Sequence, residues 1–217
     1  MKKTLILALA CLAVLASSAA AEVMLVGIVD GDLSGGRPKA VELFVSADGT
    51  DLSEYNLRNA NNGNSDWYSN QTDLSGTANA GDYLYACNGD GTAFSDWFGF
   101  AADFTGVGNL SINGDDVVGL FKGDTLIDVY GNLGEDGTGT AWEYMDGWAY
   151  RNDNTAPSTT FDAGDWQIEN GVCDGNTTNA GCNPSMPVGT YQIPEPSTAA
   201  MLMILGLLAF AFRRNHR

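Results

Sequence analysis

The chain has 217 residues, with 27 acidic and ten basic side chains and a formal net charge of −17. From Glu22 to Ile193 the imbalance is larger, with 26 acidic and five basic side chains. Because nucleic-acid binding requires Lys and Arg to neutralise phosphates, this composition excludes DNA and RNA as partners and disfavours anionic lipid head groups. Calcium, basic proteins and neutral glycans remain compatible with it, and the negative charge also favours solubility.

The first residues have the pattern of an export signal. Lys2 and Lys3 are followed by the apolar run Thr4–Leu15, and Ala19–Ala21 provide small residues ahead of Glu22. This order is typical of a Sec-type signal peptide, so we expect residues 1–21 to be removed by cleavage between Ala21 and Glu22. The mature chain is therefore expected in an oxidising compartment.

Short apolar runs separated by Gly, Asp, Asn and Ser occupy the chain from Glu22 to Arg151. The Lys122-Gly123-Asp124 segment between two such runs predicts a hairpin, because Gly accepts the positive φ that a tight turn needs. No long window shows helical periodicity, although Phe94–Phe98 is compatible with one helical turn. The pattern predicts an all-β domain, a β-sandwich over residues 22–151. The predicted strands are Val23–Val29, Ala40–Val45, Asp82–Cys87, Val117–Phe121, Thr125–Tyr130 and Tyr144–Arg151.

Residues 152–193 have a different composition, rich in Pro, Thr and Asn, with Trp166 and Ile168 as a short apolar island. We expect an extended appendage or spacer there rather than a second domain. Cys173 and Cys182 flank a short polar loop, and in an oxidising compartment they are expected to form a disulfide. Cys87 ends an apolar run and is expected to be a buried core thiol.

The C-terminal residues 194–217 contain Pro194-Glu195-Pro196, the apolar run Thr198–Phe212 and a terminal cluster of arginines. As a helix, this run reaches roughly 22 Å, a marginal span for a bilayer core about 30 Å thick. The basic cluster predicts a cytoplasmic C-terminus for this short transmembrane helix. An ordinary single-pass membrane anchor is the alternative interpretation.

This order of motif, apolar run and basic cluster resembles the PEP-CTERM sorting signal. The resemblance implies cleavage by an exosortase-type enzyme. It further implies that the protein passes transiently through the inner membrane and then reaches the outer cell surface or the extracellular matrix of a Gram-negative bacterium.

Several segments between Val23 and Arg151 also resemble, in order, the lamin-tail domain of bacterial secreted proteins. The resemblance implies an immunoglobulin-like β-sandwich and a scaffold or binding module, and it does not carry over the nuclease activity of some proteins that contain this domain. The matching segments are Ser34–Phe44, Asp51–Leu57, Gly114–Leu120, Ile127–Gly131 and Trp142–Arg151.

An enzymatic function is not expected, and we predict no catalytic residue. The single histidine, His216, lies beyond the apolar run and would be lost on sorting. Ser–His and Cys–His nucleophile pairs therefore cannot form in the mature domain, and zinc would lack imidazole ligands. Paired carboxylates remain formally able to support a metal-dependent hydrolase, since acidic residues are abundant.

No cofactor is expected, although a structural calcium ion remains open because Asp and Asn oxygens in Gly-rich loops suit hard cations. Asp-Gly pairs are equally typical of turns without metal. The candidate ligands are Asp30 and Asp32, together with Asp115 and Asp116. Further candidate clusters are Asn88–Asp90 and Glu135–Gly139.

Two further sets of side chains invite structural or functional interpretations. Glu42 lies between apolar neighbours, and we expect it to form an ion pair with Arg37, Lys39 or Arg151. An aromatic set near the end of the sandwich is predicted to pack in the core, with a sugar-stacking platform as the alternative. These aromatic residues are Trp142, Tyr144, Trp148 and Tyr150.

The sequence thus predicts a non-catalytic secreted protein of the cell surface or extracellular matrix, acting as a scaffold or adhesion module. A carbohydrate-binding module of the exopolymer matrix is the first alternative, and a metal-dependent hydrolase is the second. The expected partners are an exosortase-type enzyme, the membrane before processing, and exopolysaccharide or other surface proteins.

Overall fold

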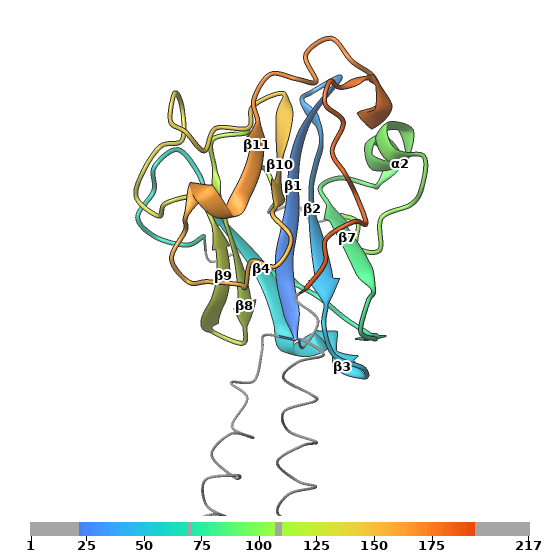
Figure 1. Ribbon diagram of the computed structural model, residues 1–217, viewed down its shortest axis with the longest axis vertical. Coiled ribbons are helices and arrows are strands. Elements are labelled where there is room, and N and C mark those ends of the chain that lie inside the picture. The colour runs from blue at the N-terminus through green and yellow to red at the C-terminus, as the bar shows by residue number, and fades with distance from the viewer. Residues whose placement is uncertain (1–21, 69–70, 107–109, 194–217) are drawn as a thin grey trace, which may run out of the picture.

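The computed structural model describes residues 22–68, 71–106 and 110–193 (Figure 1). The predicted signal peptide, Pro194, Glu195 and Pro196 of the sorting motif, and the predicted transmembrane helix lie outside the described residues. Within the described part of the chain, no helix is long and apolar enough to cross a membrane.

Two antiparallel sheets pack face to face as a β-sandwich, as the sequence predicts (Figure 1). The five-stranded sheet has the order β11-β10-β1-β2-β7, and the four-stranded sheet has the order β5-β4-β8-β9. The first comprises β11 (Trp166–Glu169), β10 (Gly147–Arg151), β1 (Val23–Leu33), β2 (Arg37–Val45) and β7 (Tyr83–Cys87). The second comprises β5 (Thr72–Asp73), β4 (Tyr55–Ala60), β8 (Val117–Lys122) and β9 (Thr125–Tyr130).

The remaining elements of the described residues are short. A two-stranded pair joins β3 (Thr50–Asp51) and β6 (Thr77–Ala78), and one α-helix, α2 (Thr92–Phe98), lies where the sequence allows a helical turn. The 3-10 turns are η1 (Leu52–Glu54), η2 (Ala163–Asp165) and η3 (Asn179–Gly181).

Each of the six predicted strands is confirmed. β9 has the predicted bounds, and each of the other five differs from its prediction at one end. The expected hairpin is β8–β9, in which Lys122 pairs with Thr125. Gly123 closes its turn with φ of +58°, a left-handed conformation that favours glycine over residues with a side chain.

The five-stranded sheet is buried on both of its faces. Leu25 and Ile28 of β1 face the four-stranded sheet and join the core between the sheets. Met24 and Val29 point to the opposite face, called the outer face below, and join a second core there. Alternate residues of β1 therefore enter two different cores, which explains why this strand is a continuous apolar run rather than an alternating one.

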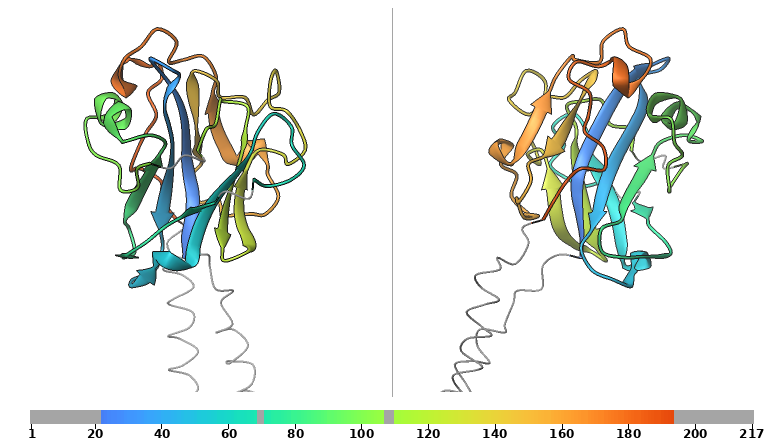
Figure 2. Two further views of the ribbon diagram at one scale, coloured as in Figure 1. Left: turned by 180° about the vertical axis from the view of Figure 1, so that it is seen from behind. Right: turned by 45° about the vertical axis from the view of Figure 1, so that its right-hand side comes forward.

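The second core is covered by α2 and by the C-terminal segment (Figure 2). Phe94 and Trp97 of α2 pack there with Cys173, Met186 and Tyr191. Residues 152–193, which the sequence predicts as an appendage or spacer, therefore lie against the sandwich and also supply the edge strand β11. The prediction missed this packing because much of it is made through backbone groups and a few separated apolar side chains.

A buried ion pair joins the two sheets along one side of the sandwich. Nη2 of Arg151, on β10, donates to both carboxylate oxygens of Asp128, on β9, at 2.7 and 2.8 Å. Asp128 also accepts from the backbone N–H groups of Leu25 and Ser158. The Arg151 guanidinium lies over the Trp166 ring, 4.5 Å from its centroid. The charge of Asp128 is thus compensated on several sides.

Candidate functional site

Glu42 is the centre of a polar contact on the outer face of the five-stranded sheet. It lies on β2 and is only 1% exposed. Its Oε1 accepts hydrogen bonds from the Tyr150 hydroxyl at 2.8 Å and from the Gly189 backbone N–H at 2.9 Å. The Tyr150 oxygen in turn accepts from the backbone N–H groups of Thr190 and Tyr191, both at 3.1 Å. Two side chains of the sheet therefore hold three consecutive residues of the C-terminal segment.

The expected ion pair of Glu42 is wrong. Lys39 pairs with Asp30 and Arg151 pairs with Asp128, so neither reaches Glu42. No described residue hydrogen-bonds to Glu42 Oε2, which is buried. Burial raises the pKa of the Glu42 carboxyl to about 7, against the lowering effect of Gly189 and Tyr150. Since the alternation of β2 directs Glu42 away from the side where Arg151 points, the sheet separates these two charges.

The segment Met186–Gln192, called the clasp below, runs along the five-stranded sheet (Figure 2) and is hydrogen-bonded to the domain at several residues. Tyr191 is 1% exposed, its carbonyl accepts from the Tyr83 hydroxyl, and its own hydroxyl donates to Thr155 O. The Gln192 N–H donates to the Asp153 carboxylate at 2.9 Å. The Gln192 carbonyl accepts from the N–H of Asn154. The domain therefore holds the chain as far as Gln192.

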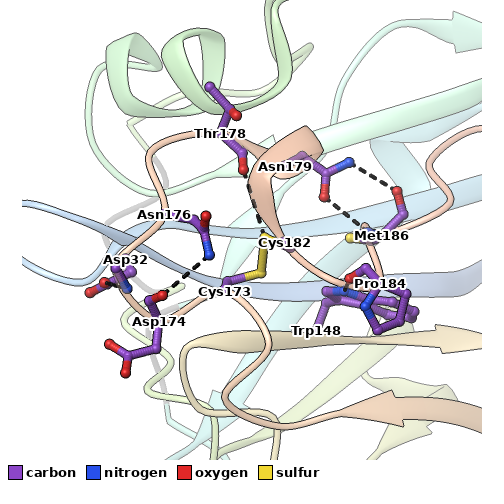
Figure 3. Close-up of a disulfide and its surroundings, with 11 residues drawn as sticks. Asp32, Trp148, Cys173, Asp174, Asn176, Thr178, Asn179, Cys182, Pro184 and Met186 are labelled. Carbon is purple, nitrogen blue, oxygen red and sulfur yellow. Dashed lines mark hydrogen bonds between the residues drawn. A yellow bond between two sulfur atoms is a disulfide. The ribbon is translucent and has the colours of Figure 1, made fainter.

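The predicted disulfide between Cys173 and Cys182 is present, and it lies just ahead of the clasp (Figure 3). Both cysteines are buried in the outer core. The Trp148 indole N–H donates to the Pro184 carbonyl at 3.0 Å. The disulfide loop thus fastens the chain that enters the clasp to the outer face of the sheet.

Two hydrogen bonds from a single amide hold the start of the clasp. The Asn179 side chain donates to the Met186 carbonyl and accepts from the Met186 N–H (Figure 3). Cys87 is also buried in the outer core and is a free thiol, as expected.

Asp30 and Asp32, the first pair of calcium ligands predicted from the sequence, both contact protein groups. Asp30 is buried in a salt bridge with Lys39 at 2.8 Å. Burial raises the pKa of Asp30 to about 6, and the Lys39 charge opposes this effect. Asp32 accepts from the Gly175 N–H in the disulfide loop.

The second candidate pair is also engaged by the protein. Asp116 is buried and accepts from the backbone N–H groups of Asn62 and Asn113. Burial raises the pKa of Asp116 to about 6. Asp115 accepts from the Thr138 hydroxyl. Across the three described ranges, no group of three or more His, Cys, Asp or Glu residues is arranged to hold a metal ion.

The other two acidic clusters lie in loops. Asp90 borders an open pocket of about 300 Å³ at the start of α2, where its carboxylate accepts from the Thr92 N–H. Asp136 accepts from the Thr138 N–H, and Glu135 accepts from the Trp142 indole N–H. These are contacts typical of turns.

All four aromatic residues of the possible sugar-stacking platform are buried. Trp142, Tyr144, Trp148 and Tyr150 are all at most 4% exposed, which favours core packing over sugar stacking for this set. Trp97 and Trp166 are likewise buried. Trp67 is half-buried, contacts the Phe121 ring and packs partly against the core between the sheets.

The described chain thus defines a disulfide-closed β-sandwich whose C-terminal segment is bound to its surface. Residues 192–215 match the PEP-CTERM protein-sorting motif. This motif indicates a protein that an exosortase system sorts to the cell surface. No curated protein matches the chain, and no solved structure matches it.

Proposed function

We propose that this protein is a non-catalytic scaffold or adhesion module of the cell surface or extracellular matrix, with a lamin-tail-like, immunoglobulin-like sandwich as its exported unit. The observation that carries the proposal is the direct continuity between a closed sandwich and a sorting motif that begins at Gln192. The strongly acidic surface suits a role in a hydrated matrix, because it keeps the domain soluble and limits its binding to anionic lipid.

Delivery is tested by expressing the full chain in Gram-negative cells with and without an exosortase. The comparison includes a variant in which Pro194, Glu195 and Pro196 are all replaced by Ala. We expect wild-type protein to become accessible to an external antibody only when the enzyme is present, and the variant to stay with the cell membranes. Equal surface exposure of the variant would contradict the sorting step.

The structural role is tested by deleting the gene. We expect the deletion to reduce the amount of matrix that sediments with the cells, and the wild-type protein to restore it. Rapid hydrolysis of glycoside, ester or phosphodiester substrates, abolished by a chelator, would contradict this role and favour the metal-dependent hydrolase.

One observation favours the carbohydrate-binding alternative. Trp67 and Tyr68 are adjacent and partly exposed, Tyr68 by 39%, and Trp67 packs only partly against the core between the sheets. Aromatic rings with an exposed face can stack on sugar rings. A glycan array probed with wild-type protein and with Trp67→Ala tests this directly. Binding that is lost in the variant would establish the alternative, and the absence of any bound glycan would contradict it.

A further inference from the structure

The clasp is held mainly by hydrogen bonds from its backbone to side chains of the domain. The four consecutive backbone N–H groups from Gly189 to Gln192 all donate to side chains rather than to a neighbouring strand. Three of them depend on Glu42 and Tyr150, since Tyr150 itself is positioned by its bond to Glu42. The clasp is thus bound through a few side chains, and a change in one of them affects several bonds together.

No cation in the described chain compensates the charge that Glu42 acquires when it ionises beneath the clasp. The polar groups that face it are the Tyr150 hydroxyl from β10, the Gly189 N–H from the clasp, and Tyr83 and Tyr85 from β7. None of these is a cation, and no Lys or Arg in the described chain forms a salt bridge with Glu42. A buried carboxylate in this setting is unfavourable when charged, whereas an open clasp would let water solvate it.

The clasp also lies immediately before the sorting motif. The motif match starts at Gln192, and only Pro194–Ser197 separates the last described residue from the apolar run. Four extended residues span at most about 14 Å. An enzyme that binds an extended peptide on the N-terminal side of this motif must therefore take residues that the closed clasp holds.

We propose that the clasp is a switch governed by the ionisation of Glu42: it binds the start of the sorting segment while Glu42 is protonated, and it opens when Glu42 is charged, so that the processing enzyme gains these residues. The opening of the clasp does not depend on the proposed function. The transfer of the segment to the enzyme rests on the proposed function, because it requires sorting by that enzyme.

The size of the effect follows from linkage. With a pKa of about 7 in the closed clasp and the ordinary value of 4.5 in the open one, ionisation favours opening. The equilibrium constant for opening should increase about 30-fold between pH 5.5 and pH 8.5, because Glu42 loses its proton at a lower pH in the open form than in the closed form.

Hydrogen exchange measures this opening directly. The full-length chain in detergent is exchanged at pH 5.5 to 8.5, and the protection of residues 186–193 is corrected for the intrinsic exchange rate at each pH. We expect clasp protection to fall about 30-fold in the wild type across this range and to stay constant in Glu42→Gln. Unchanged protection in the wild type, or the same fall in Glu42→Gln, would overturn the proposal.

A second variant keeps the test independent of how well Glu42→Gln folds. Tyr150→Phe removes the acceptor for the Thr190 and Tyr191 N–H groups, so it should lower clasp protection at every pH. Tyr144→Phe is the matched control, because Tyr144 is equally buried but lies in the core between the sheets. Equal clasp protection in both variants would contradict the proposed attachment.

The transfer step is tested in cells that contain the sorting enzyme. We expect Tyr150→Phe to be processed several-fold faster than wild type and Tyr144→Phe at the wild-type rate. If clasp opening follows pH but all three chains are processed equally fast, the transfer step is overturned while surface sorting stands. If no chain is processed, the sorting function itself is contradicted.

Discussion

Two buried carboxylates on opposite faces of the five-stranded sheet have different partners. Asp128 lies between the sheets, is 0% exposed, and binds Arg151 together with backbone N–H groups. Glu42 lies on the outer face, is 1% exposed, and has a hydroxyl and one N–H as its partners. Both are isolated from water, but only Asp128 has a cation.

The difference indicates which contacts are permanent. Burial raises the pKa of Asp128, and the Arg151 charge and the N–H donors act against it. At Glu42 the same burial is opposed only by uncharged donors, and the pKa rises to about 7. The junction between the sheets is thus a constant part of the fold, whereas the attachment of the clasp depends on pH near neutrality.

The largest effect is expected when the cation at Asp128 is removed. Arg151→Met would leave a buried carboxylate without its partner, which typically costs about 3–5 kcal/mol of unfolding free energy. Urea unfolding measures this loss. Arg58→Met is the control, because the Arg58 partner Asp124 has a 97% exposed side chain and the pair should contribute about 1 kcal/mol or less. Equal losses in the two variants would contradict the assigned role of Asp128.

A pH series tests the contrasting behaviour of Glu42. Below pH 4.5 both the folded and the unfolded state are protonated at this position, and between pH 4.5 and 7 only the folded state keeps its proton. Stability from this group is therefore complete at low pH and lost as the pH rises through 7, by about 3 kcal/mol in total.

Comparison with Glu42→Gln isolates this contribution. Asp30 and Asp116, whose pKa values burial raises to about 6, act in both chains and cancel in the difference. We expect the wild type to lose about 3 kcal/mol more than the variant between pH 4 and pH 8.5. Parallel stability curves would show that Glu42 is ionised without cost.

Removal of the disulfide tests the attachment of the chain ahead of the clasp. Replacing both Cys173 and Cys182 by Ser releases a loop of sequence separation nine and should cost about 2–3 kcal/mol on the chain-entropy model. Unfolding of the variant and of the reduced wild type should agree. If reduction destabilised the wild type but the double Ser variant kept the full unfolding free energy, this assignment would be contradicted.

The smallest effect concerns the fit of Met186 on the sheet. A Cβ at Gly27 would overlap the terminal methyl of Met186 in the clasp. Gly27→Ala should therefore cost about 1–2 kcal/mol by overpacking. Adding Met186→Ala should recover part of this loss, because the two groups occupy the same space. Strictly additive losses would show that the clasp does not contact Gly27.

Much of the sandwich could be predicted because its strands are apolar runs separated by turn residues, as at β8 and β9. The disulfide was also predictable, since Cys173 and Cys182 flank a polar loop in an exported chain. The sorting motif was recognisable from its order of segments, and the match to residues 192–215 confirms it.

The clasp and its partners could not be predicted. Its N–H groups bind Tyr150 and Glu42, more than forty residues away for most of these bonds, and no local pattern in the sequence indicates such contacts. The sequence shows Glu42 as a charge among apolar residues, but its partner depends on which face of β2 it occupies. The face that Glu42 occupies follows from the tertiary packing, in which one core lies on each face of the five-stranded sheet.

The C-terminal segment is a layer of the folded domain rather than a loose extension. Tyr191→Ala, compared with Tyr68→Ala in urea unfolding at pH 6, tests this most directly. Tyr191 is 1% exposed and Tyr68 is 39% exposed. We predict one cooperative transition in both, with a loss of about 3 kcal/mol for Tyr191→Ala and less than about 0.5 kcal/mol for Tyr68→Ala. A loss at Tyr191 as small as that at Tyr68 would contradict the account.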